Sequence, residues 1–382
     1  GAAVREVYST LRAGLGNARH VFTRTGKGRV AFLGGSITFN SGWRDHVCED
    51  LRARFPETEF TFIAAGIPST GSTPGAFRLA RDVLAAGQVD LLFQEAAVND
   101  STNGRGELEQ LRGMEGIVRR ARVHNPAVDV VVLHFVDPAK MADYRAGRVP
   151  EVIATHERVA EHYALPSIDL AREVTERIDR GEFTWKDDFK NLHPSPFGQR
   201  VYSRAIARLF DRAWPQEAPA SESPGAHALP AALDAYCYDA GELREPGGAT
   251  QLDGFSLVER WRNTVGGATR PGFVDVTMLV GEVPGARFDY VFRGRAVGLF
   301  VAAGNDAGTL EYRIDGGTWR RQDLFTRWSR GLHLPWLYVL EAELDAATEH
   351  RLEVRIADES NSASRGHACR IAHFAVNGPP PE

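Results

Sequence analysis

The segment Gly34-Gly35-Ser36-Ile37-Thr38 directly follows the apolar run Val30-Ala31-Phe32-Leu33. Such a run predicts a buried strand, and the glycines after it predict a sharp turn at the strand's C-terminal end. The turn presents the Ser36 hydroxyl where a nucleophile can act, with backbone N–H groups free to face a developing negative charge. Small residues after a strand are also ordinary turn chemistry, so the meaning of Ser36 depends on its partners.

Apolar runs and helical patterns alternate over residues 30–211, as they do in a parallel sheet covered by helices. We predict strands at Val30–Leu33, Phe60–Ala64, Val89–Phe93, Val128–Leu133 and Ser167–Leu170. A last helix is expected from about Pro196 to Phe210, with proline in its first turn. The pattern predicts a three-layer α/β/α domain with a central parallel sheet.

Residues 215–230 lose all periodicity and have the composition of a linker. Beyond them, short alternating runs predict strands at Phe288–Phe292, Val297–Val301, Leu310–Ile314 and Leu352–Ile356. Asp315-Gly316-Gly317 predicts a hairpin turn, and the absence of helical patterns between the strands favours a β-sandwich of the jelly-roll type. We therefore expect an N-terminal extension at 1–27, an α/β domain at 28–214, a linker at 215–230 and an all-β sandwich at 231–382.

Composition excludes several classes of partner. The chain has 382 residues, of which 43% are apolar and 25% charged, and its net charge is -5 with the basic residues scattered. No cationic stripe indicates nucleic acid or an anionic membrane surface, and no apolar run approaches the roughly 18 to 20 residues of a membrane helix. We interpret Gly1-Ala2-Ala3 as a processing remnant, with any export signal already absent. Nothing in the sequence decides the oligomeric state.

The three cysteines are too few and too dispersed for a disulfide framework. Cys48 falls on the apolar face of a predicted helix and is expected in the core. Cys237 and Cys369 lie near the two ends of the second domain, so a bridge between them is left open. No C-x-x-C pair indicates zinc or redox chemistry, and we expect neither a metal nor an organic cofactor.

Three polar or small residues follow predicted strands, and a histidine lies near the end of the domain. In an open parallel sheet, the residues just after the strands converge on one edge, where ligands bind. Ser36 follows the first strand, Gly66 the second and Asn99 the third, while His193 lies near the end of the domain. The sequence therefore predicts a hydroxyl, a glycine amide, a carboxamide and an imidazole at one site.

These residues, in this order, resemble the blocks of the SGNH (GDSL-type) hydrolase superfamily over roughly residues 28–212. The resemblance implies a serine esterase in which Ser36 is the nucleophile and His193 the general base. It further implies an oxyanion hole made by the backbone N–H groups of Ser36 and Gly66 and the side-chain amide of Asn99.

The chain departs from the family pattern in three places. Gly35 stands where an aspartate usually precedes the serine, and Ala97 where the third block usually has glycine. Lys190 occupies the position three residues before the histidine, where the family has the aspartate that orients the imidazole. A lysine cannot accept the imidazole N–H, so another group must do so, or a Ser-His dyad must suffice.

The nearest acids to His193 are Asp188 and Asp187, five and six residues before it. We predict that Asp188 is the orienting acid, with Asp187 as the alternative, and a backbone carbonyl could also serve. Glu95 is interpreted as a buried acid with a satisfied partner, and Asp100 as support for the Asn99 loop. Four further histidines, His124, His134, His156 and His162, lack metal-ligand spacing and are expected in surface roles.

A glycine-serine first block followed by a sandwich domain resembles carbohydrate O-acetylesterases more than lipases, and no long apolar lid is visible near Ser36. We therefore predict removal of O-acetyl groups from a carbohydrate by a secreted or periplasmic enzyme. The alternatives are a short-chain carboxylesterase or thioesterase acting on lipidic or small esters, and a catalytically impaired binding protein. The aromatic-rich segment 325–338 is expected to be mainly core, with a sugar-binding platform as the alternative.

Overall fold

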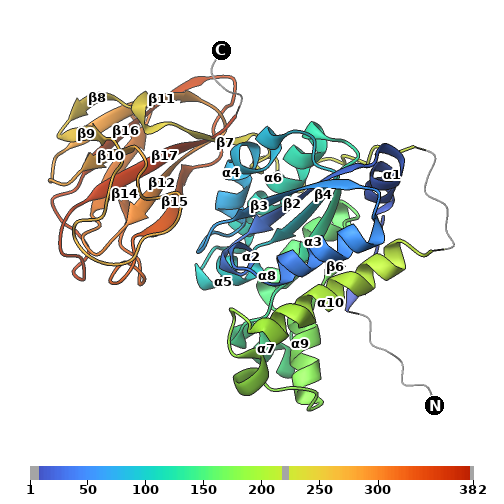
Figure 1. Ribbon diagram of the computed structural model, residues 1–382. Coiled ribbons are helices and arrows are strands. Elements are labelled where there is room, and N and C mark those ends of the chain that lie inside the picture. Colours follow the sequence, from blue (N-terminus) through green and yellow to red (C-terminus); the bar gives the residue numbers. More distant parts are fainter. Residues whose placement is uncertain (1–7, 217–222, 379–382) are drawn as a thin grey trace. The chain divides into compact units, whose positions relative to one another are not determined.

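The computed structural model describes residues 8–216 and 223–378 and divides the chain into two compact units at Asp239 (Figure 1). The ends of the chain at 1–7 and 379–382, and the centre of the expected linker at 217–222, lie outside the described residues. Each unit has its own hydrophobic core.

The first unit is built on a six-stranded sheet with the order β1-β6-β5-β4-β2-β3. Its strands are β1 (Ser9–Thr10), β2 (Lys27–Gly34), β3 (Glu59–Gly66), β4 (Leu91–Glu95), β5 (Asp129–Leu133) and β6 (Ser167–Ile168). Strands β2 to β6 are parallel, and the two-residue β1 pairs antiparallel with β6 at the edge. All five predicted strands are present, so the central parallel sheet is confirmed.

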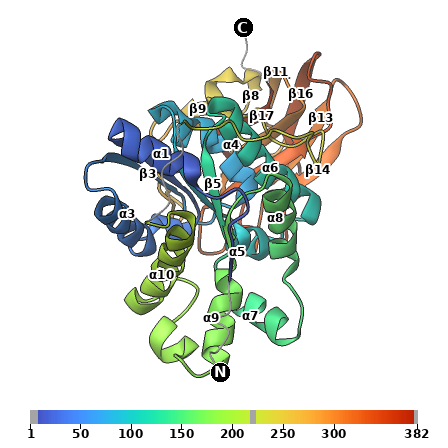
Figure 2. The same cartoon turned by 90° about the vertical axis from the view of Figure 1, so that its right-hand side faces the viewer.

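Helices cover both faces of this sheet. One face carries α1 (Gly16–Thr25), α3 (Trp43–Arg54) and α10 (Pro196–Ala213), and the other carries α4 (Ser72–Asp82), α6 (Glu107–His124) and α8 (Glu151–His162) (Figure 2). The shorter helices are α2 (Ser36–Phe39), α5 (Ala97–Thr102), α7 (Pro138–Arg145) and α9 (Leu170–Asp179). In the core, Phe32 stacks on Phe93 at 5.1 Å and Trp43 packs edge-on against Phe32 at 5.5 Å. This arrangement confirms the three-layer α/β/α architecture.

Residues 223–239 follow the centre of the expected linker and pack on the α/β domain. His227 Nε2 lies 2.8 Å from Asp129 Oδ1, and Arg112 Nε donates to Asp234 Oδ1 at 3.0 Å. Further along, Arg119 Nε donates to Asp239 Oδ2 at 3.2 Å. These polar contacts place the boundary between the compact units at 239/240, nine residues beyond the expected start of the sandwich.

The second unit is an antiparallel β-sandwich, which confirms the expected all-β class. One sheet has the order β15-β12-β17-β10-β9, with β7 also paired to β17, and the other has the order β14-β13-β16-β11-β8. The strands are β7 (Gly241–Arg244), β8 (Thr250–Asp253), β9 (Phe255–Val258), β10 (Met278–Gly281), β11 (Arg287–Arg293), β12 (Ala296–Ala303), β13 (Thr309–Ile314), β14 (Arg320–Asp323), β15 (Leu334–Glu341), β16 (Glu349–Ile356) and β17 (Cys369–Asn377).

The predicted hairpin turn lies between β13 and β14. Asp315 and Gly316 have φ values of 52° and 71°, the left-handed pair that a tight hairpin needs. In the segment 325–338, Leu334 and Leu337 are buried in the sandwich, as expected for core residues, whereas the Trp328 side chain is 38% exposed.

Cys48, Cys237 and Cys369 are all buried free thiols, so the bridge left open between Cys237 and Cys369 is absent. Within residues 8–216 and 223–378, no helix combines the length and apolar character needed to cross a bilayer.

Candidate active site

Ser36 and His193 meet at the C-terminal edge of the central sheet. Ser36 is the first residue of α2, directly after β2, and its Oγ lies 2.7 Å from Nε2 of His193 in the loop before α10. Ser36 is half-buried and His193 is exposed. A hydroxyl within hydrogen-bond distance of an imidazole, with one side open, is the arrangement that serine acyl transfer requires.

The loop that carries His193 is held at both ends. The π-helical turn η2 (Trp185–Phe189) precedes it, and the backbone N–H of Ser195 donates to Phe189 O at 2.9 Å. Beyond the histidine, Gln199 accepts from the backbone N–H of Trp43 at 2.9 Å, which ties α10 to the start of α3. Asn191 Oδ1 accepts from the backbone N–H of His193 at 2.8 Å. The imidazole is therefore presented by a braced loop.

Asp188 is half-buried in η2. Its Oδ2 accepts from the backbone N–H of Thr184 at 2.7 Å and from the Thr184 hydroxyl at 3.1 Å, and its carbonyl accepts from the Ser195 hydroxyl at 2.5 Å. Asp187 is exposed. Asp188 thus links the start of η2 to the start of α10, and its role as the orienting acid stays a prediction.

Lys190, at the position of the family's aspartate, is exposed and has a positive φ of 84°. Its backbone N–H donates to Trp185 O at 2.6 Å. A non-glycine residue in this backbone region carries local strain, so the loop geometry departs from a regular turn at the residue where the sequence departs from the family.

The glycines beside Ser36 are required by close packing rather than by backbone conformation, because neither Gly34 nor Gly35 has a positive φ. A Cβ at Gly34 would lie 2.0 Å from Glu95 Oε1, and a Cβ at Gly35 would lie 2.0 Å from Asn99 Oδ1. We predicted glycine at positions 34 and 35 because of a sharp turn, but the structure requires glycine there because a side chain would clash with Glu95 or Asn99. Gly35 leaves the room that the Asn99 side chain occupies.

Gly66 and Asn99 complete the expected set. Gly66 ends β3 opposite Gly34 at the end of β2, and the next N–H, of Ile67, donates to Gly34 O at 3.0 Å. Asn99 lies in the first turn of α5, which follows β4. The sheet therefore brings Gly66 to the same strand end as Ser36, and Asn99 lies beside Gly35 at that end.

Glu95, the last residue of β4, lies beneath this turn. Its Oε1 accepts from the backbone N–H of Gly35 and from the hydroxyl of Thr38, both at 2.6 Å. Burial is the main cause that raises the pKa of Glu95 to about 7. The expectation of a buried acid with satisfied partners is confirmed.

A second buried network lies behind Asn99. Asp100 accepts from the backbone N–H of Ser72 at 2.9 Å and from its hydroxyl at 2.6 Å, and His156 Nε2 lies 3.0 Å from Asp100 Oδ2. His134 pairs with Glu157 at 2.7 Å. The network fixes the start of α5, which agrees with the supporting role expected for Asp100.

The surface role expected for His134 and His156 is wrong, since both side chains are fully buried. Burial is also the main cause that lowers the pKa of His156. The sequence did carry a signal for this histidine: Val152, Val159 and Ala160 share its helix face at intervals of three or four residues.

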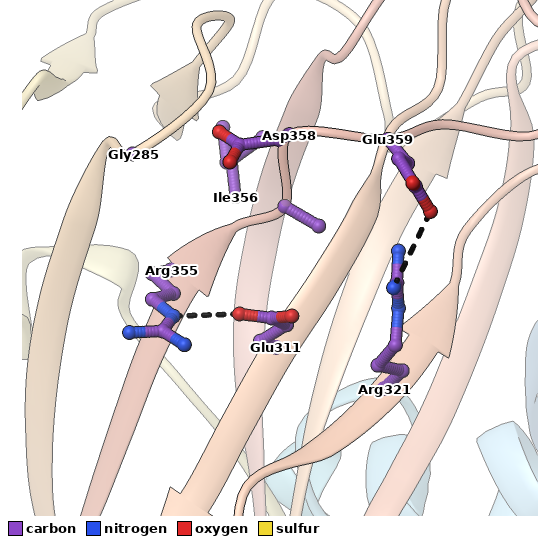
Figure 3. Close-up of a pocket in the computed structure, with 8 residues that line it drawn as sticks. Gly285, Glu311, Arg321, Arg355, Ile356, Asp358 and Glu359 are labelled. Atoms are coloured by element: carbon purple, nitrogen blue, oxygen red, sulfur yellow. Dashed lines mark hydrogen bonds and ion pairs between the residues drawn. The ribbon is translucent and has the colours of Figure 1, made fainter.

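Among the described side chains, no group of three His, Cys, Asp or Glu residues is arranged to hold a metal ion. A cavity of about 450 Å³ lies in the second unit, beside β13, β14 and β16 (Figure 3). Its walls carry ion pairs between Arg355 and Glu311 at 2.6 Å and between Arg321 and Glu359 at 3.6 Å. These charges are already neutralised within the protein, and the cavity contains neither Ser36 nor His193.

Residues 32–201 match the GDSL-like Lipase/Acylhydrolase family. The first unit is a GDSL-type acylhydrolase domain. The match spans the turn that carries Ser36, the helix that carries Asn99 and the loop that carries His193, and it identifies the domain as that of an ester-bond hydrolase. A search of curated proteins finds no match.

Solved structures resemble the whole chain, including the unit beyond the GDSL-type domain. A two-domain esterase described as active on acetylated mannans has a TM-score of 0.76 and 21% identity, covering 97% of this chain and 98% of that one. Its structure co-crystallised with mannopentaose gives a TM-score of 0.74, also at 21% identity, with the same coverage. The likeness establishes a shared two-domain fold.

Proposed function

We propose that this protein is a serine esterase that removes O-acetyl groups from a carbohydrate through an acetyl-enzyme. The observation that carries the proposal is the 2.7 Å contact between Ser36 Oγ and His193 Nε2 in a GDSL-type domain. Both partners come from segments that the fold braces independently, the turn after β2 and the loop before α10.

In the proposed reaction, His193 Nε2 takes the Ser36 proton while Oγ attacks the acetyl carbonyl. The oxyanion accepts hydrogen bonds from the N–H groups of Ser36 and Gly66 and from the amide of Asn99. The tetrahedral intermediate then collapses, and the sugar hydroxyl leaves with the proton that His193 carried. Water, deprotonated by His193, hydrolyses the acetyl-serine and releases acetate.

Two observations support a carbohydrate as the substrate. The similar esterase that is described as active on acetylated mannans shares both units of this chain. In this chain, His193 is exposed and Ser36 half-buried, an open setting that suits an acetyl group carried on a bulky sugar. A polysaccharide substrate also agrees with the expected secretion or periplasmic location, which we retain as part of the proposal.

The test is a series of p-nitrophenyl esters combined with acetate release from acetylated mannan. We expect kcat/KM to fall from acetate to butyrate to octanoate, acetate to be released from the polymer, and Ser36→Ala to abolish both activities. Faster cleavage of butyrate or octanoate would instead indicate a carboxylesterase or thioesterase.

Lys190 favours one other candidate, a GDSL-type binding protein with impaired catalysis, because it replaces the expected orienting acid. A fluorophosphonate distinguishes the two, since it labels only an activated serine. Labelling of the wild-type protein but not of Ser36→Ala supports the esterase. Absence of labelling, together with retained binding of acetylated oligosaccharides, would support the binding protein.

A further inference from the structure

One peptide unit, the bond between Gly34 and Gly35, is held at both polar ends by buried charged side chains. Arg78 Nη2 donates to the carbonyl of Gly34 at 2.9 Å, and the N–H of Gly35 donates to Glu95 Oε1 at 2.6 Å. Arg78 is 0% exposed and Glu95 is 3% exposed. This peptide lies immediately before Ser36, so it fixes the direction of the backbone that leads into Ser36.

The same carboxylate oxygen also holds the chain after the nucleophile. The Thr38 hydroxyl donates to Glu95 Oε1 at 2.6 Å, and Thr38 is fully buried. Ser36 therefore lies between Gly35 and Thr38, and both of these residues donate a hydrogen bond to the same atom, Glu95 Oε1. Neither contact involves a group that substrate would touch.

Building on the proposed function, we propose that Glu95 is a positioning residue that fixes Ser36 in its attacking orientation before substrate binds. Preorganised donors and nucleophiles accelerate acyl transfer because they need no rearrangement as charge develops. A carboxylate suits the task because hydrogen bonds to an ionised acceptor are shorter and stronger than those to a neutral one. The substrate does not contact Glu95 in this scheme.

The charge of Glu95 is sensitive to pH in the range where the enzyme would work. Its charged and titratable neighbours are Arg78 on α4, Asp100 on α5 and Tyr202 on α10. Burial raises its pKa to about 7, although the bonds from Thr38 and Gly35 and the charge of Arg78 oppose the rise. Protonation below pH 7 therefore weakens the hold on the Ser36 turn.

The test compares the pH dependence of p-nitrophenyl acetate hydrolysis in the wild type and in Glu95→Gln, which keeps the shape and one acceptor oxygen but does not titrate. In the wild type, the general base His193 must lose a proton and loss of the Glu95 proton raises the rate further, so the acid limb of log kcat/KM should have a slope above one near pH 7. Glu95→Gln should return the slope to one. At pH 8 its kcat should be about five- to thirtyfold below wild type, the loss expected from weakened charge-assisted hydrogen bonds, with KM changed less than twofold.

Glu115→Gln is the matched control, because Glu115 is also fully buried and accepts from a hydroxyl, that of Tyr163, and a backbone N–H, that of Leu233. Glu115 lies on α6, and its partners are Tyr163 at the end of α8 and the backbone at residues 233 and 234, so its variant should keep the wild-type slope. If Glu95→Gln also keeps that slope, with kcat within twofold of wild type, the proposal is overturned.

A second pair of variants covers the case in which Glu95→Gln does not fold. Thr38→Val removes one of the two bonds to Glu95 and should lower kcat, whereas Thr38→Ser keeps the hydroxyl and should restore most of it. Equal kcat in both variants would contradict the proposal. Failure of the proposed esterase function gives a different result, since fluorophosphonate would then leave Ser36 of the wild-type protein unlabelled.

Discussion

A Cβ built on Gly35 would lie 2.0 Å from Oδ1 of Asn99. Real side chains do not approach so closely, so Gly35→Ala must push Asn99 away from the turn that carries Ser36. Since loss of one oxyanion donor typically costs about 10²- to 10³-fold in rate, we expect Gly35→Ala to lower kcat to that extent on p-nitrophenyl acetate. Gly16→Ala is the control, because no atom lies within 4 Å of its Cβ position. Unchanged kcat in Gly35→Ala would show that the site does not need Asn99 in this place.

Asn99→Ala removes the proposed donor directly. We expect kcat to fall by about 10²- to 10³-fold while KM changes little, because the amide would act on the transition state and not on the bound ester. If Gly35→Ala acts by displacing Asn99, the double variant should be no slower than the slower single variant. Steady-state kinetics of the wild type, the two single variants and the double variant test this expectation. If the two losses in kcat multiply in the double variant, Gly35→Ala and Asn99→Ala act independently.

Asp188 and Asp187 are distinguished by single substitutions to asparagine. We expect Asp188→Asn to lower kcat/KM at least tenfold, since the substitution removes the charge of the carboxylate that is predicted to orient His193 and that accepts from the backbone N–H and hydroxyl of Thr184, whereas exposed Asp187 should tolerate the change. Circular dichroism and the unfolding temperature would identify any loss that comes from a disturbed loop. If both variants keep the wild-type kcat/KM while His193→Ala is inactive, a Ser36–His193 dyad is the better description.

Phe39 is expected to contact the sugar. Its side chain is 44% exposed and lies three residues after Ser36 in α2, so the two residues share one side of the helix. An exposed aromatic ring beside Ser36 offers a stacking surface for a sugar ring. Phe39→Ala should therefore raise KM for an acetylated oligosaccharide several-fold and leave p-nitrophenyl acetate hydrolysis within twofold. An equal loss on both substrates would assign Phe39 to the Ser36 turn itself.

The positions of Ser36, Gly66 and Asn99 could be predicted because each follows a strand whose apolar run is plain in the sequence. Parallel strands end at one edge, so chain order alone places these residues together. The path of the loop that carries His193 could not be predicted in the same way. This loop is set by contacts between distant segments, such as Gln199 with Trp43, which leave no local pattern.

Burial of Glu95 was expected, but burial of Arg78 could not be predicted from local pattern. Arg78 is fully enclosed because it donates to the backbone carbonyl of Gly34, and Asp100 because it accepts from the backbone N–H of Ser72. The first compact unit extends beyond the expected end of the α/β domain for a similar reason. The segment after residue 222 lacks periodicity, but its side chains pair with charges on α6, which holds it to the first unit.

Ionisation of Glu95 should cost stability. Its pKa is raised by burial from 4.5 to about 7 in the folded protein, so the unfolded chain releases this proton at lower pH than the folded one. The contribution of Glu95 to the free energy of unfolding is therefore largest below pH 4.5, declines as pH rises to 7 and is constant above it. Relative to Glu95→Gln, the wild type should lose up to about 3 kcal/mol across that interval, at about 1.4 kcal/mol for each pH unit.

Urea unfolding of both proteins at pH values from 5 to 8 measures this difference, with Glu115→Gln as the reference for a buried glutamate elsewhere. Parallel stability curves for wild type and Glu95→Gln would mean that Glu95 does not ionise in this interval. Glu95 could then not affect the acid limb of the rate profile, and that part of the proposal would be contradicted. A wild-type curve that falls relative to that of Glu95→Gln as pH rises would mean that the ionised carboxylate beneath Ser36 costs stability. Such a cost is understandable where the charge holds a reacting group in place.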